Sequence, residues 1–236
     1  MAADEFSTIR NRIVCRMVNA KRNAELLKDR PYTPIADLAV IYEIRISNSR
    51  NMTVPFTYDL MSTYNILIDD IHNAAIRNID PWTFDLYDYL SEFLPSGKSN
   101  DDRPTSYVIT TNNRLYGAAA ILRNEVMDQI AQIFPDGFYL IPSSVHEFIV
   151  ISKMILIDDD DLRGKINNCI REVNREFVKP DEYLSDHFYN YDIKEHRITM
   201  DKESVIEKLN QNKENARSNR SKQEPEKNKR KGIDME

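Results

Sequence analysis

The first apolar pattern along the chain has the period of a helix. Apolar residues recur at spacings of three and four between residues 4 and 30, which predicts an amphipathic helix. Pro31 and Pro34 follow, and we expect the helix to end there because proline lacks a backbone N–H and restricts the residue before it. The predicted apolar face consists of Phe6, Ile9, Ile13, Val14, Met17 and Val18.

A pair of strands is predicted next. Residues 37–47 (DLAVIYEIRIS) are rich in apolar and β-branched residues, and apolar and charged residues alternate from Tyr42 onward. This pattern indicates a strand whose first half is buried on both faces. Residues 48–51 predict a turn and residues 52–60 a paired strand, in which Pro55 favours an edge position.

The helical spacing returns from Met61 onward. Asp69 and Asp70 fall in an early turn, where the helix dipole favours negative charge. The predicted apolar stripe consists of Leu67, Ile68, Ile71, Ala74, Ala75 and Ile79.

Aromatic residues gather in the following segment, residues 78–94, before a predicted internal loop over residues 95–104. Such a stripe is typical of a core or, where it is exposed, of a partner-binding face. Its members are Trp82, Phe84, Tyr87, Tyr89 and Phe93.

The second half of the chain is predicted as strand, helix, two strands, helix and a final hairpin. The last helix opens on four acidic residues, which suits a helix N-terminus. Its apolar stripe runs from Leu162 to Phe177. In order, the predicted segments are strand 106–110, turn 111–114, one or two helices over 115–134, turn 135–137, strands 138–142 and 147–157, helix 158–178, and strands 187–192 and 196–200 around a turn at 193–195.

This mixture of strands flanked by helices predicts an α+β (mixed α/β) fold. We expect residues 1–95 and residues 105–200 to form one compact unit. Residues 201–236 contain almost nothing apolar, and basic residues outnumber acidic ones between Lys213 and Lys231. Because this tail buries too little apolar surface to offset its ordering entropy, it is predicted to be disordered or frayed.

Composition narrows the class of protein. The formal net charge of -6 gives the whole molecule no general attraction to nucleic acid or to an anionic membrane. No apolar run approaches the ~20 residues of a membrane span, and the first residues lack the apolar core of a signal peptide. Cys15 and Cys169 show no metal or redox spacing and are expected to be buried free thiols in a reducing compartment. We therefore expect a cytoplasmic protein with no membrane partner and no cofactor.

Four segments in chain order carry a resemblance to a known family. They are residues 11–42 (beginning NRIVCRMVNAKRN), 107–122 (YVITTNNRLYGAAAIL), 138–151 (FYLIPSSVHEFIVI) and 171–192 (beginning REVNREFVKPDEY). On these segments the chain resembles a bacterial family of uncharacterised proteins, catalogued as domain of unknown function 5688. The resemblance implies no assigned activity. Members usually carry an extra segment before the first of these motifs, so this chain is expected to be a shortened variant or a fragment.

Ser143, Ser144, His146 and Glu147 lie between two apolar runs and have two interpretations. In an extended segment Ser144 and His146 would face the same side and could form a nucleophile–base pair, with Glu147 on the other side. No glycine-rich elbow or oxyanion loop lies nearby in the sequence. Alternatively, Ser144-x-x-Glu147 matches a capping box in a turn between strands. We favour the structural interpretation, which leaves His146 unexplained.

Asp186 and His187 extend the catalytic hypothesis. A site built from the 143–147 and 185–187 loops would need them to cluster with Ser144 and His146 in space. The same histidines and acids, together with His196, show no H-E-x-x-H or comparable spacing, so no metal site is expected.

Residues 110–120 (TTNNRLYGAAA) are predicted as a strand end, a polar turn and a helix start, a geometry that can hold an anion on backbone N–H groups. Asn113, Arg114 and Ser143 are therefore candidates for ligand binding. The segment lacks the glycine pattern of a phosphate loop. We favour close packing of Gly117 to Ala120 against a sheet or helix.

Three classes of function remain open from the sequence. The leading one is a binding or accessory module without catalysis that has a protein partner, which an exposed aromatic patch from Trp82 to Phe93 would favour. The second is an enzyme whose pocket joins Ser144, His146 and Asp186. The third is a nucleic-acid-associated factor that uses its basic tail.

Overall fold

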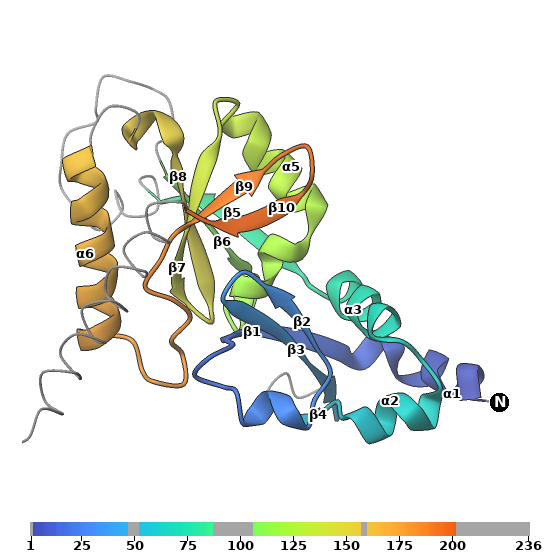
Figure 1. Ribbon diagram of the computed structural model, residues 1–236. Helices are drawn as coiled ribbons and strands as arrows, with labels where there is room; N and C mark the ends of the chain where they lie inside the picture. The colour runs from blue at the N-terminus through green and yellow to red at the C-terminus, as the bar shows by residue number, and fades with distance from the viewer. Residues whose placement is uncertain (1, 47–51, 87–105, 157–159, 202–236) are drawn as a thin grey trace, which may run out of the picture. The chain divides into compact units, whose positions relative to one another are not determined.

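Two antiparallel sheets, here sheet A and sheet B, carry the fold (Figure 1). Helices accompany both sheets, so the predicted α+β class is confirmed. Residues up to Met200 form one compact unit. No helix in the part of the chain that the structure describes is long and apolar enough to cross a membrane. The structure is a computed structural model that describes residues 2–46, 52–86, 106–156 and 160–201.

Some predictions fall outside these ranges. They concern the turn at 48–51, the loop at 95–104, the tail from residue 202 onward, and the aromatic residues Tyr87, Tyr89 and Phe93.

Sheet A is built around β3 (Leu38–Arg45). One edge of β3 pairs antiparallel with β1 (Ile13–Asn19), and the other pairs with β2 (Tyr32–Ile35) and β4 (Thr53–Pro55). Successive β3 side chains alternate between a large core shared with sheet B and a smaller cluster around Val18 and Leu27. The predicted strand buried on both faces is therefore confirmed, as is the edge position of Pro55.

The predicted helix over residues 4–30 is wrong for most of its length. The segment forms α1 (Ala2–Ile9), the 3-10 turn η1 (Arg10–Arg12), strand β1 and a second 3-10 turn η2 (Leu26–Lys28). Ile13, Cys15 and Met17 are buried at every second position. Their period of two fits a strand as well as the wider spacing fits a helix, and pairing with β3 decides the outcome.

The helical region after sheet A begins earlier than predicted. Only Thr53 to Pro55 of the expected strand over 52–60 is extended, because α2 (Tyr58–Tyr64) starts at a capping residue. The hydroxyl of Thr57 accepts the N–H of Leu60 at 3.3 Å. After α2 follows α3 (Ile68–Arg77), whose Asp70 carboxylate accepts the N–H of Leu67 at 2.9 Å.

Sheet B has the strand order β10-β9-β7-β8-β6-β5. The strands predicted from residue 106 onward, including the final hairpin, are confirmed, whereas β5 lies in a segment that was predicted as part of a helical region. The expected strand over 147–157 ends at Ser152, where the 3-10 turn η4 (Lys153–Leu156) follows. The strands are β5 (Pro81–Asp85), β6 (Ser106–Thr111), β7 (Phe138–Ser144), β8 (Glu147–Ser152), β9 (Tyr189–Asp192) and β10 (Arg197–Met200).

Helices pack against both faces of sheet B (Figure 1). On one face Ile166 and Ile170 of α6 (Asp160–Glu176) pack with Tyr139 and Phe188. The opposite face joins the large core with α5 (Asn124–Ile133) and the 3-10 helix η3 (Gly117–Leu122).

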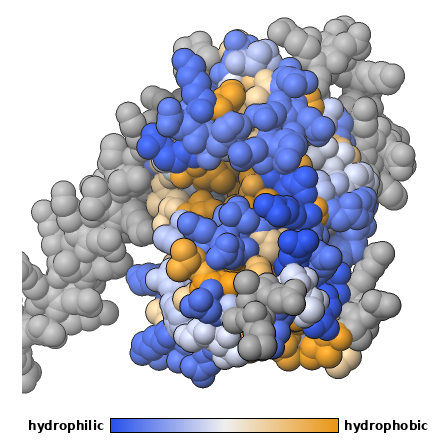
Figure 2. All heavy atoms as spheres, turned by 90° about the vertical axis from the view of Figure 1, so that its right-hand side faces the viewer, coloured by the Kyte–Doolittle hydropathy of each residue, from blue (hydrophilic) through white to orange (hydrophobic). Residues whose placement is uncertain are grey.

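Most of the surface seen in Figure 2 is hydrophilic, with hydrophobic atoms gathered in recessed patches. Three residues predicted on apolar stripes are nevertheless exposed: Leu67 at 72%, Phe177 at 78% and Val173 at 39%. Leu67 lies just before α3 and Phe177 just after α6, so neither side chain is held on the buried face, whereas Val173 lies inside α6 near its end. Ile71 and Ala75 in the middle of α3 are fully buried.

Gly117 has the least room for a side chain among the glycines that the structure describes. A Cβ at this position would collide with Thr110 Oγ1 and would lie 2.5 Å from the carbonyl oxygen of His146 and 2.6 Å from the N–H nitrogen of Thr111. The favoured interpretation of Gly117 to Ala120 as a close-packing segment is therefore confirmed, since all four residues are buried.

Gly117→Ala should lower the free energy of unfolding by about 1–3 kcal/mol or more, because two of the three colliding groups are backbone atoms that cannot turn aside. Urea unfolding at fixed pH measures the change. The matched control is Gly164→Ala in α6, where a Cβ meets nothing within 4 Å. This substitution should raise the free energy of unfolding by about 0.5–1 kcal/mol. Equal stability of the two variants would contradict the account.

Candidate functional site

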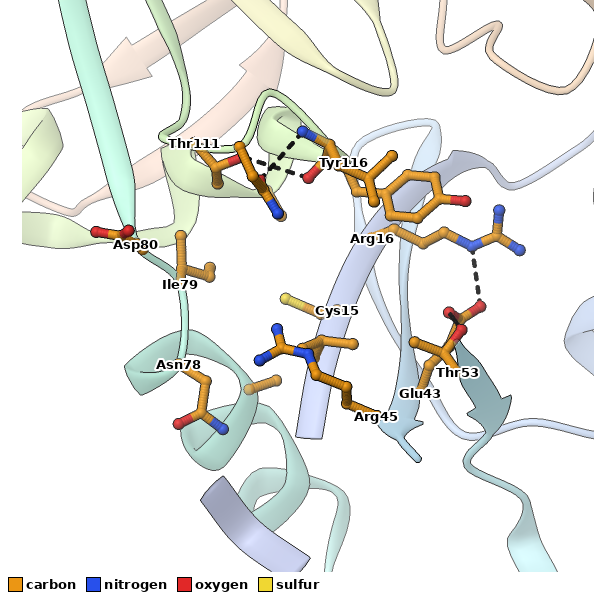
Figure 3. A pocket seen from close by; sticks show the side chains of 15 residues that line it. Cys15, Arg16, Glu43, Arg45, Thr53, Asn78, Ile79, Asp80, Thr111 and Tyr116 are labelled. Atoms are coloured by element: carbon orange, nitrogen blue, oxygen red, sulfur yellow. Dashed lines mark hydrogen bonds and ion pairs between the residues drawn. The ribbon is translucent and has the colours of Figure 1, made fainter. Parts of the chain in front are cut away.

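A pocket of about 450 Å³ lies beside the edge strand β1 (Figure 3). Its walls come from β1, β3 and β4 of sheet A, from the end of α3, and from residues 111–119 between β6 and η3. This volume falls within the range of about 300–1,000 Å³ that small-molecule sites occupy. All of the lining belongs to the unit that ends at Met200.

An ion pair forms one wall of the pocket. Arg16 lies opposite Ile41 and Glu43 opposite Val14, so Arg16 and Glu43 are diagonal neighbours on one face of sheet A. The Arg16 Nε atom is 3.2 Å from Glu43 Oε1, a close ion pair whose N–H is not aligned as a hydrogen bond.

Glu43 is only 8% exposed and is held in place from a second side. The hydroxyl of Thr53 donates to Glu43 Oε2 at 2.6 Å. The guanidinium of Arg16 in turn lies over the Tyr116 ring, 5.3 Å from its centroid. The pair is therefore fixed by groups from β1, β3, β4 and the 116 turn.

Arg45 is the second cation of the pocket, two residues after Glu43 on the same face of β3. Figure 3 shows its side chain extending into the pocket on the side of Cys15 and Asn78. Its Nε is buried and has no hydrogen-bond acceptor among the described residues. A buried guanidinium N–H without an acceptor is costly, so this atom favours an acceptor supplied from the pocket.

Small apolar side chains form another part of the lining, beside polar residues such as Asn78 and Thr111. Val14, Cys15, Ala75, Ile79 and Ala119 lie around the charged wall. Burial raises the pKa of the Cys15 thiol to about 12, so the group stays protonated near neutral pH and acts as a small apolar side chain. Its place in the pocket therefore does not make it a nucleophile.

The polar turn that was predicted to hold an anion is only partly in the pocket. Asn113 belongs to the lining, where its Oδ1 accepts the Thr111 hydroxyl at 2.8 Å and the Leu115 N–H at 3.2 Å. Arg114 is exposed and adopts a left-handed backbone with φ of 55°, and its guanidinium lies 4.9 Å from the Trp82 ring centroid. Arg114 is not among the lining residues, and η3 is a six-residue 3-10 turn rather than an anion-binding helix.

The segment with Ser143, Ser144 and His146 is the tip of the β7–β8 hairpin, and Ser144 pairs with Glu147. The predicted capping box is wrong in its contacts. Ser144 Oγ accepts the backbone N–H of His146 at 3.1 Å, and the Glu147 carboxylate accepts the hydroxyl of Ser143 at 3.2 Å. Because a two-residue turn joins the strands, no helix N-terminus exists here to be capped.

His146 is explained by its contacts with two other segments. Its Nδ1 accepts the backbone N–H of Tyr116 at 3.1 Å, and its ring stacks on the Tyr116 ring at a centroid distance of 5.7 Å. Its Nε2 is 3.7 Å from the carboxylate of Glu182, whose carbonyl accepts the N–H of Val145. His146 therefore joins the hairpin tip to the turn that carries Tyr116, and it is not among the pocket-lining residues.

The segment of Asp186 and His187 packs near α6. Asp186 accepts a hydrogen bond from Asn174 at 2.9 Å, and the N–H of His187 donates to Ser185 Oγ at 3.2 Å. The carboxylate beside His146 belongs to Glu182 rather than to the predicted Asp186. Across the described residues, no group of three or more histidines, cysteines and acids could hold a metal ion.

The sequence did not single out Arg16, Glu43, Arg45 or Tyr116. In the sequence, the charged residues of β3 indicated only the polar positions of a strand with alternating apolar and charged residues. The helix prediction for residues 4–30 hid the pairing of β1 with β3, and without that register Arg16 and Glu43 are unrelated positions. Two cations around a carboxylate on neighbouring strands could have been found once β1 was recognised as a strand.

Comparison with known proteins gives one match. The family model described as "Family of unknown function (DUF5688)" matches residues 2–193, so the chain belongs to this family, as its four motifs indicated. No curated protein and no solved structure matches the chain.

Thiol reactivity tests the state of Cys15. Cys169 was expected to be buried, but it lies on an exposed position of α6 and should react readily with a disulfide reagent at pH 8. Cys15 should not react in the folded protein, because its pKa of about 12 leaves almost no thiolate. In a Cys169→Ser variant, no thiol should therefore react rapidly in the native protein, and one thiol should react rapidly after unfolding in urea. Fast reaction of the native Cys169→Ser variant would show that Cys15 is accessible and ionised.

Proposed function

We propose that this member of DUF5688 is a small-molecule-binding protein that holds its ligand in the pocket beside β1 without converting it. The observation that carries the proposal is the unsatisfied, buried Nε of Arg45 inside a cavity of about 450 Å³. Native proteins leave few buried polar groups unpaired, and those that remain often mark a site. The proposal keeps the binding role of the leading interpretation of the sequence but replaces its protein partner with a small molecule.

The arrangement of the lining supports binding over catalysis. Cys15 supplies a thiol to the lining, and burial raises the pKa of that thiol so that it stays protonated. Arg16 and Glu43 neutralise each other and are fixed by Tyr116 and Thr53, which suits recognition rather than proton transfer.

The alternatives from the sequence have less support. An enzyme built from the 143–147 and 185–187 loops would need His146 to be available, but Tyr116 and Glu182 already occupy its two ring nitrogens. In the aromatic segment, the rings of Trp82 and Phe84 lie at a centroid distance of 4.6 Å with a tilt of 37°, and both residues are half-buried. A role of the basic tail in nucleic-acid binding stays a prediction about residues outside the described ranges.

A fragment screen read by amide chemical shifts tests the proposal. Small organic compounds should shift the amides of the pocket, such as those of Val14, Thr111 and Leu115. Val14→Trp should weaken these hits by about tenfold or more, because the larger ring fills the pocket. The matched control is Val54→Trp on the exposed edge strand β4, outside the lining, which should leave them unchanged.

Two outcomes would contradict the proposal. One is that shifts gather at the 143–147 and 185–187 loops and are insensitive to Val14→Trp, which would favour the enzyme hypothesis. The other is that no compound shifts any amide of the pocket.

A further inference from the structure

We infer that the ligand of this pocket is an amphipathic monoanion, an organic carboxylate whose head group binds Arg45 and whose apolar body lies on the small side chains beside it. The inference rests on the proposed function and names the class of compound that the same site takes.

The charges of the pocket lining favour a ligand that carries a single negative charge. The guanidinium groups of Arg16 and Arg45 and the carboxylate of Glu43 carry a net charge of +1, and Asp80 brings the net charge of the whole lining to zero. Asp80, the other carboxylate of the lining, is exposed, and its charge disfavours a doubly charged anion further. A carboxylate therefore balances the site, whereas a phosphate monoester would carry excess negative charge next to Glu43.

We expect the guanidinium of Arg45 to bind the anionic head group of the ligand. Arg16 already has an ion-pair partner in Glu43, and one face of its guanidinium lies over the Tyr116 ring. The side chain of Arg45 makes no hydrogen bond or ion pair with another residue of the described chain, and its buried Nε needs an acceptor. A carboxylate can satisfy that Nε together with a terminal nitrogen, because the planar fork of a guanidinium matches two carboxylate oxygens.

The body of the ligand is expected to be apolar. The apolar part of the lining includes Val14, Cys15 and Ile79, and of these Val14 and Ile79 are partly exposed. These side chains offer no strong donor or acceptor, and the thiol of Cys15 is protonated. A hydroxylated body such as a sugar would lose its hydrogen bonds to water on this wall, whereas an alkyl or aryl group gains by leaving water.

Four probes distinguish the contribution of the anionic head group to binding from that of the apolar body: octanoate, octan-1-ol, octyl phosphate and acetate. Each is titrated below its micelle concentration, and binding is followed by the amide chemical shifts of the pocket. Octanoate should bind about tenfold to a hundredfold more tightly than octan-1-ol, as a charge-assisted pair predicts. It should also bind more tightly than octyl phosphate and than acetate, which lack the matching charge and the apolar body respectively.

Arg45→Gln should reduce octanoate binding to the level of octan-1-ol and leave octan-1-ol binding unchanged. The matched control is Arg114→Gln, which removes an exposed guanidinium outside the lining and should leave all four affinities unchanged. Arg45→Lys keeps the charge and should retain a measurable preference for octanoate over octan-1-ol. Thermal unfolding of each variant without probe shows whether it is folded.

The outcomes distinguish this inference from the proposed function. If octanoate and octan-1-ol bind the pocket equally and Arg45→Gln changes neither, the pocket binds small molecules but not through an anionic head, and the inference is wrong. Tighter binding of octyl phosphate, loss of all preference in folded Arg45→Lys, or an equal effect of Arg114→Gln would overturn it as well. If octanoate shifts no amide of the pocket, the inference is also wrong. In that case the fragment screen decides separately whether the pocket binds other small molecules.

Discussion

The close approach of Gly117 to the strands around it is the constraint on which the rest of the structure depends. The segment from Gly117 to Ala120 is buried and contacts β1 of sheet A as well as β6 and β8 of sheet B. Only a residue without a Cβ fits against Thr110 and the carbonyl of His146. The three alanines that follow are buried too, and they belong to one core with residues from the inner faces of both sheets.

The same constraint creates the pocket. The turn before η3 holds Tyr116 in a left-handed conformation, with φ of 53°, and His146 fixes it by accepting its N–H. Tyr116 then lies against Arg16, while Ala119 contributes to the apolar wall. His146, which a catalytic interpretation of the sequence would have used as a base, thus acts as a structural link between the hairpin tip and the pocket.

The sequence predicted most elements but not the register that places the site. The alternation of apolar and charged residues predicted the strand β3, the turn signal predicted the turn before Phe138, and the helical spacing predicted α6. These three elements were confirmed. In residues 13–19 both periods are present, and only the long-range pairing with β3 selects the strand. Because the Arg16–Glu43 pair exists only in that register, local patterns could not reveal it, and they drew attention to Ser144 and His146 instead.

The central claim is that the guanidinium of Arg45, whose Nε is buried, binds an anionic head group inside the pocket. A crystal structure of the protein grown with octanoate tests this claim most directly. We predict density for the carboxylate at about 2.7–2.9 Å from the guanidinium nitrogens of Arg45, with the alkyl chain along Val14 and Ile79. Octanoate bound elsewhere, with Arg45 paired to a carboxylate of the protein itself, would contradict the account.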